Sequence, residues 1–359
     1  MEQTTAARFF LGANSKTGFF SLYDSFPDLA AGDFLWVIKG GPGCGKSSFM
    51  KRIGAAARAA GMRAEYILCS GDPDSLDGVY IPERRVAYVD GTAPHVIEAT
   101  CPGASSLYLD LGAFLDAGAL RSHLPELADL NRRYRALYDL AYAQLAAGAA
   151  LLPKNRPGVL AGEAIDAMER RIDAIAAKEL RPQKKSARVT HRFLSARSCQ
   201  GRIVLTDTMQ ALAPRLFVLE NTLGLGHVAL ERLAELAGAR GYDTVRCHDP
   251  LEPEKLEALL LPERSLCLFA SDDAALPLPE PERRLRLDAL SLRFLPTKER
   301  PILRRMKRES RTLLEAAQAS LAQAKALHDD LEAVYHPHVD FDGVNALSED
   351  HIRWLLEPK

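Results

Sequence analysis

This 359-residue sequence has no closely spaced pair of cysteines and almost no net charge. Its six cysteines lie far apart without any C-x-x-C spacing, which argues against a structural zinc site or a disulfide framework and suits a reducing compartment. The 46 Lys and Arg nearly balance the 47 Asp and Glu, so the formal net charge is -1. We therefore expect no nucleic-acid partner and no electrostatic attraction to a membrane.

Long apolar runs are missing as well. No stretch of about 18 apolar residues could cross a bilayer, and the N-terminus has no cationic and apolar leader. With 47% hydrophobic and 26% charged residues the composition is that of a globular protein, and the length allows two domains with full cores. These features predict a soluble, cytoplasmic protein.

One glycine-rich segment stands out. Residues 40–47 read GGPGCGKS and fit the P-loop pattern G-x-x-x-x-G-K-[ST], in which glycines let backbone N–H groups face a triphosphate, the lysine reaches the β- and γ-phosphates and the hydroxyl binds Mg²⁺. The apolar run 34–40 predicts a strand before it, and SSFMKRIGAAARAAG predicts a helix after it that Gly61 can end. We expect ATP and Mg²⁺ to bind here. The nucleotide-binding residues would be Gly40, Gly41, Pro42, Gly43, Cys44, Gly45, Lys46, Ser47 and Ser48, with Ser47 also a metal ligand and Lys46 also catalytic.

A second apolar run ends in an acidic residue. RRVAYVDG at residues 84–91 ends in Asp90 and has the layout of a Walker B strand, 44 residues after Lys46. We expect Asp90 to hold the Mg²⁺ ion or its coordinated water. Candidates for an arginine that supplies charge to the transition state are Arg84, Arg85 and Arg188, and the second repeat or a partner subunit is the expected source.

Further polar candidates lie close to these motifs. CSGDPDSLDGVYIPE at residues 69–83 places Asp72 and Asp74 after a predicted strand, where open α/β sheets bind ligands. As catalytic residues they could position Mg²⁺, a water or an acceptor hydroxyl, although Asp-Pro-Asp is equally a turn former. A turn better explains Asp77. His95 could sense the γ-phosphate or orient the attacking water, or it could be an ordinary loop residue.

The chain contains a second copy of this strand, loop and helix sequence in which the functional side chains are replaced. The segment from residue 191 aligns with the segment from residue 8, and residues 216–242 align with residues 35–61 at an offset of 181. The glycine pattern survives, but the functional side chains do not. The aligned pairs are Gly43 with Gly224, Gly45 with Gly226, Lys46 with His227, Ser47 with Val228 and Asp90 with Ala270.

Each half also has helical periodicity. Apolar residues spaced three and four apart over 127–141 and 165–175 predict an antiparallel helical hairpin, and the same spacing over 303–334 predicts one helix of more than thirty residues. Such stripes pack a hairpin or the two repeats together, or bind a partner protein or a second copy. The basic residues 181–188 predict a linker, and HPHVDFDG at 336–343 predicts a connector more than a metal site.

Three segments carry a resemblance to a known family. KGGPGCGKSSFMKRI, CSGDPDSLDGVYIPE and VAYVDGTAPH resemble a bacterial family of uncharacterised tandem P-loop ATPases, and the likeness covers nearly the whole chain. The resemblance implies the fold, ATP and Mg²⁺ more than a biological role. Members usually carry a P-loop in each half, and this chain departs from that pattern in its second half.

The fold expected is α/β, a tandem duplication of P-loop NTPase-like, mainly parallel sheets, each with a long helical hairpin. Residues 1–185 would form the intact repeat and residues 186–359 the degenerate one. The function expected is Mg²⁺-dependent ATP hydrolysis at the first repeat, with ATP preferred over GTP because no N-K-x-D-like guanine reader is present. Alternatives are a small-molecule or nucleoside kinase and a non-hydrolysing, nucleotide-dependent switch or scaffold.

Overall fold

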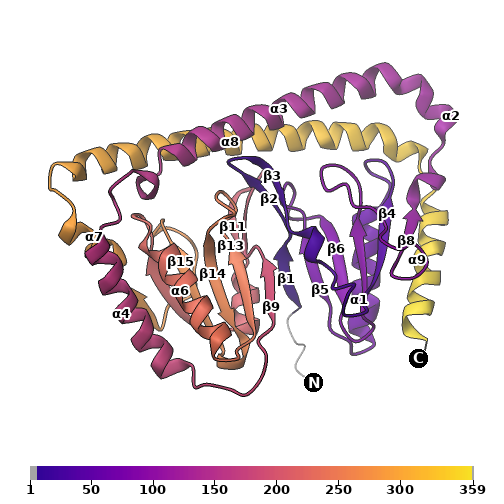
Figure 1. The fold of residues 1–359 in the computed structure, drawn as a ribbon. Helices are drawn as coiled ribbons and strands as arrows, with labels where there is room; N and C mark the ends of the chain where they lie inside the picture. Colours follow the sequence, from indigo (N-terminus) through magenta and orange to yellow (C-terminus); the bar gives the residue numbers. More distant parts are fainter. Residues whose placement is uncertain (1–5, 358–359) are drawn as a thin grey trace.

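The computed structural model describes residues 6–357, and over these residues it forms two six-stranded sheets with helices around them (Figure 1). The first sheet has five mutually parallel strands and one strand, β6, antiparallel to both of its neighbours. Its inner strands read as apolar runs because both of their faces are buried. In sheet order the strands are β1 (Ala7–Phe10), β5 (Glu65–Leu68), β6 (Leu76–Ile81), β7 (Val86–Asp90), β4 (Phe34–Lys39) and β8 (Ser106–Asp110).

The second sheet has the same order and the same strand directions as the first. Its antiparallel strand, β14, lies at the place that β6 takes in the first sheet. The prediction of an α/β protein with two mainly parallel sheets is therefore confirmed. The strands that match β1 to β8 in sheet order are β9 (Val189–Arg192), β13 (Thr244–His248), β14 (Leu256–Leu261), β15 (Leu266–Ser271), β12 (Arg215–Glu220) and β16 (Arg283–Leu285).

The two halves meet through aligned residues. Phe10 N donates to Phe193 O at 3.0 Å and Phe193 N donates to Phe10 O at 2.9 Å, and both side chains are fully buried. A contact between equivalent residues is what an approximate twofold axis between the halves requires. Two hairpins flank this contact, β2 (Gly12–Ser15) with β3 (Gly18–Ser21), and β10 (Ser195–Ser198) with β11 (Gly201–Val204).

The helix after the glycine-rich loop forms as its sequence predicts. Helix α1 (Lys46–Ala59) buries a face that includes Phe49, Ile53 and Ala57, which are spaced four apart and so lie on one side. The chain leaves the helix through Gly61, whose φ of 81° is left-handed. In the second half α6 (Leu225–Ala239) takes the corresponding place, and α5 (Thr206–Leu212) precedes β12.

The long helices correct the prediction of a hairpin within each half. Helix α3 (Leu124–Ala150) lies antiparallel to α8 (Glu299–Tyr335), which comes from the other half, and the pair runs above both sheets (Figure 1). Leu127 and Leu130 of α3 cluster with Leu327 and Leu331 of α8. A stripe with spacing three and four predicts an apolar seam but does not say which helix covers it.

The last helix of each half lies on the sheet of the other half. Helix α4 (Gly162–Glu179) packs against α6 and α7 (Leu287–Phe294), whereas α9 (Phe341–Leu356) packs against α1. The boundary expected after residue 185 therefore separates the strands of the two sheets but not the helices that cover them. The remaining short helices are α2 (Ala117–Leu120), η1 (Tyr23–Ser25), η2 (Leu111–Phe114), η3 (Arg121–His123), η4 (Pro153–Asn155), η5 (Pro262–Arg264) and η6 (His336–His338).

Two smaller expectations concern the C-terminal region and the membrane. Residues 336–340 form a connector, since η6 ends α8 and Asp340 caps α9 by accepting from Gly343 N at 3.0 Å, whereas residues 341–343 already belong to α9. Among residues 6–357, no helix combines the length and the apolar character needed to cross a membrane.

Candidate functional site

The glycine-rich loop joins the end of β4 to the start of α1. Gly43 and Gly45 have φ angles of 68° and 87°, the left-handed region that only glycine enters easily. A Cβ at Gly43 would also lie 3.2 Å from the carbonyl oxygen of Glu332 on α8. Glycine is thus required both by the curl of the loop and by the helix above it.

A cavity of about 780 Å³ opens between this loop and the α3–α8 pair. Of the nine predicted nucleotide-binding residues, all except Gly41 line it. Pockets of a few hundred to a thousand cubic ångströms are typical of small-molecule sites. The roof comes from elements far away in the sequence, with Tyr134, Arg135 and Tyr138 from α3 and Lys325 and His328 from α8.

Lys46 lies between the loop and the predicted metal ligand. Its Nζ donates to Gly41 O at 2.9 Å and to Gly40 O at 3.3 Å, and it lies 3.7 Å from Asp90 Oδ2. The side chains of Lys46 and Asp90 are only 13% and 14% exposed. The two predicted residues, 44 positions apart in the chain, therefore meet in one partly buried ion pair.

Ser47 and Asp90 present oxygen atoms to the same cavity. Ser47 Oγ accepts from Leu76 N at 3.0 Å, and Asp90 Oδ1 accepts from the backbone N and the hydroxyl of Thr92 at 2.9 Å and 2.6 Å. These bonds hold both side chains in place while Asp90 Oδ2 faces Lys46. A hydroxyl and a carboxylate are hard oxygen ligands of the kind that Mg²⁺ prefers.

The aspartates of the loop after β5 point to different places. Asp72 lines the cavity, accepts from Ser75 Oγ at 3.0 Å and lies 3.4 Å from Lys325 Nζ of the roof. Asp74 does not line it, and its Oδ2 accepts from Gln200 Nε2 at 2.8 Å in the turn between β10 and β11. Only Asp72 of this pair is within reach of a ligand in the cavity.

Asp77 and His95 form a buried pair that the sequence did not indicate. Asp77 lies within β6 rather than in a turn, and its Oδ2 is 2.9 Å from His95 Nε2. The rings of Phe19 and Tyr23 pack on the imidazole with centroid distances of 4.9 Å and 5.0 Å. Burial by itself would lower the pKa of His95, but the Asp77 carboxylate outweighs it, so the pKa is raised. His95 is therefore a buried, paired residue of the cavity and not a free loop residue.

The three arginines proposed as charge donors lie outside the cavity. Arg84 and Arg85 precede β7, at the end of the sheet opposite the glycine-rich loop, and Arg85 Nε donates to Asp33 Oδ1 at 3.1 Å. Arg188 is exposed before β9. Arg135 of α3 does line the cavity, and within the described chain it makes no ion pair. Sequence reasoning missed it because nothing local indicates that α3 crosses above the loop.

The corresponding loop of the second half is closed by the chain's own groups. Helix α6 begins after Gly224, the residue aligned with Gly43, so the helix starts two positions earlier than α1 does. Asp288 of α7 then accepts from Thr222 N at 3.2 Å and from Leu223 N at 3.0 Å. A carboxylate of the chain thus takes the backbone donors of this loop.

A buried lysine fills the space beside that loop. Lys154 Nζ lies 2.8 Å from His227 Nε2, 3.1 Å from Asp249 Oδ2 and 3.0 Å from Glu252 Oε2, and its side chain is 2% exposed. His227 also donates from Nδ1 to Leu256 O at 2.6 Å, and burial followed by the charge of Lys154 lowers its pKa to about 4. The His, Asp and Glu have the spacing of a metal site, but the ammonium group contacts all three.

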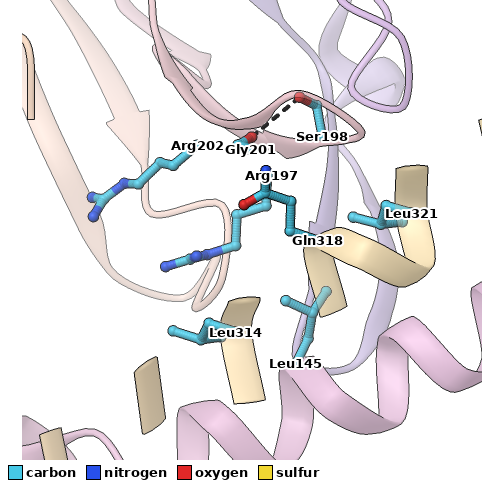
Figure 2. A pocket seen from close by; sticks show the side chains of 8 residues that line it. All are labelled: Leu145, Arg197, Ser198, Gly201, Arg202, Leu314, Gln318 and Leu321. Carbon is cyan, nitrogen blue, oxygen red and sulfur yellow. Dashed lines mark hydrogen bonds between the residues drawn. The ribbon is translucent and has the colours of Figure 1, made fainter. Parts of the chain in front are cut away.

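Two arginines of the β10–β11 hairpin complete this charged core. Arg202 donates to Glu257 Oε1 and Asp272 Oδ1, each at 2.7 Å. Arg197 lies beside it, next to a cavity of about 20 Å³ that Leu145 of α3 and Gln318 of α8 help to line (Figure 2). That volume has room for about one water molecule. Charged groups of the chain thus surround the loop of the second half.

No protein-family model, curated protein or solved structure matches this chain. The resemblance to tandem P-loop ATPases therefore stays a prediction, and the basis for a functional assignment is the arrangement of the chain's own residues.

Proposed function

We propose that this chain is a Mg²⁺-dependent ATPase of the tandem P-loop kind, with one working site at the loop from Gly40 to Ser47. The observation that carries the proposal is the convergence of Lys46, Ser47 and Asp90 on a cavity of about 780 Å³. The equal strand orders of the two sheets support a duplicated fold. The free state of all six cysteines is in keeping with a reducing cytoplasm.

The proposed roles follow from the chemistry of phosphoryl transfer, which depends mostly on positioning and charge. Backbone N–H groups at the start of α1 bind the phosphates, since a helix N-terminus with a glycine-rich loop favours anions. Lys46 leaves the loop carbonyls and neutralises charge on the β- and γ-phosphates. Ser47 and Asp90 would hold Mg²⁺, which supplies further neutralisation of the developing charge when bound.

Binding and turnover test the proposal with two single substitutions. We expect the parent protein to bind Mg²⁺-ATP and release phosphate, and Lys46→Ala and Asp90→Asn each to lower kcat by about 10²- to 10³-fold, the usual cost of one electrostatic contact to the transition state. ATP affinity would be measured by calorimetry and phosphate release by a coupled assay. Lys178→Ala, an exposed lysine of α4, is the matched control.

Two results would contradict the assignment. A folded parent that neither binds nor hydrolyses a nucleoside triphosphate would rule it out. Metal-dependent turnover that survives Asp90→Asn would move the metal site to Asp72, which lines the same cavity. ADP release only in the presence of added small molecules with hydroxyl groups would favour a kinase.

A non-hydrolysing switch is the second candidate function, and the closeness of α8 to the loop favours it. Gly43 lies against the backbone of Glu332, and Lys325 contacts Asp72. Phosphates on the loop would thus be next to the helix pair that joins the two halves. Tight ATP binding that changes amide exchange in α3 and α8, with negligible phosphate release, would support the switch over the ATPase.

A further inference from the structure

Two buried side chains of the first cavity have no role in the scheme above. Asp77 and His95 both line the cavity, and their side chains are only 7% and 5% exposed. His95 Nε2 lies 2.9 Å from Asp77 Oδ2 in an ion pair, and within residues 6–357 both His95 Nδ1 and Asp77 Oδ2 are buried without a hydrogen bond. An orphaned ring nitrogen in a ligand-sized cavity needs an explanation, because buried polar atoms are nearly always paired.

The contact with Asp77 decides which nitrogen is free. A carboxylate beside Nε2 favours the tautomer with its proton there, so the lone pair of the neutral ring lies on Nδ1. The rings of Phe19 and Tyr23 hold the imidazole in this orientation. Asp77 would also stabilise the imidazolium that forms when Nδ1 takes a proton.

The charged and titratable groups around His95 come from four elements. Asp77 of β6 and Asp90 of β7 raise its pKa, Lys46 of α1 lowers it, and burial also lowers it. The net direction is upward, so the ring takes up a proton more readily than a free histidine. Tyr23 of η1 stays neutral, because burial and then the charge of Asp77 raise its pKa well above the usual value.

The second half has lost this pair together with its other chemistry. His95 aligns with Ala275, and the counterpart of Asp77 is Glu257, which accepts from Ser195 and Arg202, whereas Asp77 lies beside an imidazole. The pair is therefore present only where Lys46 and Asp90 are present. That association connects it with the reaction at the first cavity and not with the stability of the fold, which both halves share.

We propose that His95 is the catalytic base of the first site and that Asp77 is the residue that positions it. This proposal rests on the proposed function. His95 Nδ1 takes a proton from the water whose oxygen forms a bond to the γ-phosphorus of ATP. The bond from that phosphorus to the bridging oxygen breaks, its electron pair stays on ADP, and the imidazolium later returns the proton to solvent.

Kinetics over a range of pH test the proposal. His95→Gln should lower kcat by about 10²- to 10⁴-fold, the usual contribution of a general base, with unchanged affinity for Mg²⁺-ATP. In the parent, kcat should rise with pH as His95 loses its proton, and His95→Gln should abolish this rise. Asp77→Asn should lower kcat less and move the rise to lower pH, because the carboxylate that raises the pKa of His95 is gone. His123→Gln, at a histidine outside the cavity, is the control.

A measurement without nucleotide tests the same pair. In the free parent protein, the NMR titration of the His95 ring should give a pKa above the ordinary 6.5, and Asp77→Asn should lower it. Parent-like kcat and an unchanged pH profile in a folded His95→Gln variant that binds ATP would overturn the dyad and leave the proposed function intact. An unshifted His95 titration in Asp77→Asn would overturn the positioning role. A parent that does not bind ATP would remove both proposals together.

Discussion

The two halves of this chain share one sheet topology but treat their glycine-containing loops in opposite ways. In the first half the loop opens on a cavity of about 780 Å³, whereas in the second half Lys154 contacts His227 and Asp288 accepts from the backbone of the loop. The two loops differ in which charged side chains of the chain contact them or lie beside them. The first half leaves Lys46 on loop carbonyls, whereas the second half brings in Lys154, Asp288 and Arg202 from the chain itself.

Burial explains why the second half needs so many ion pairs. A carboxylate or ammonium group removed from water is stable only with a partner of opposite charge and with hydrogen bonds. Asp249, Glu252 and Glu257 are buried and Asp272 is partly buried, and each has a cation of the chain beside it. In the second half the chain itself therefore supplies the counter-charges.

The largest effect is expected from removing Lys154, the cation that residues 1–185 contribute to the charged core of the second half. Lys154→Met leaves the carboxylate of Asp249 buried without its ammonium partner, whereas Glu252 keeps Lys16 and Lys255. Breaking a buried pair in this way costs about 3–5 kcal/mol. The free energy of unfolding would be measured by urea denaturation at neutral pH. Lys178→Met, at an exposed position of α4, is the matched control and should change the stability by less than about 0.5 kcal/mol. If the two substitutions changed the stability equally, Lys154 would not be needed to neutralise buried carboxylates in the second half.

A smaller effect on the free energy of unfolding is expected when the pH is lowered and His227 takes up a proton. The folded protein holds the pKa of His227 at about 4, below the ordinary 6.5, so the unfolded chain binds more protons between these values. The contribution of His227 is therefore complete above about pH 6.5 and is lost as the pH falls towards 4, by about 2–3 kcal/mol. Denaturation at several pH values should show a shallower loss for His227→Gln than for the parent. An equal slope would mean that His227 is not held neutral.

The smallest effect is expected at Asp74, which the structure turns away from the cavity. Asp74→Ala removes an exposed contact with Gln200, and surface changes of this kind usually alter stability by less than about 0.5 kcal/mol. Affinity for Mg²⁺-ATP should stay within about twofold of the parent, since this carboxylate is not near the ligand. Asp72→Ala, in the cavity wall, is the comparison and should weaken binding more. The reverse order would show that the loop after β5 rearranges on binding.

Much of the first site could be predicted because its geometry is local. The glycine pattern, the strand before it and the helix after it lie within about thirty residues, and the loop forms wherever glycine allows left-handed backbone. Asp90 was predictable because parallel strands end at the same edge of a sheet. Asp77 was misjudged because an Asp-Gly pair usually marks a turn, whereas here β6 continues through it.

The partners of the long helices were not predictable from their apolar spacing. The stripe on α3 would suit any helix with a matching stripe, and the choice of α8 over α4 depends on how the two sheets join at Phe10 and Phe193. The same holds for Arg135, which reaches the cavity only because α3 crosses above it.

By itself the sequence determined the two sheets, the single intact glycine-rich loop and the loss of Lys, Ser and Asp from the second half, because each feature is encoded by short contiguous segments. The tertiary structure decided the exchange of helices between the halves, the pairing of Asp77 with His95 and the filling of the second site by Lys154. These contacts join residues far apart in the chain. Their formation depends on which surfaces exclude water and which buried charges then need a partner, and only the folded arrangement of all the elements settles that.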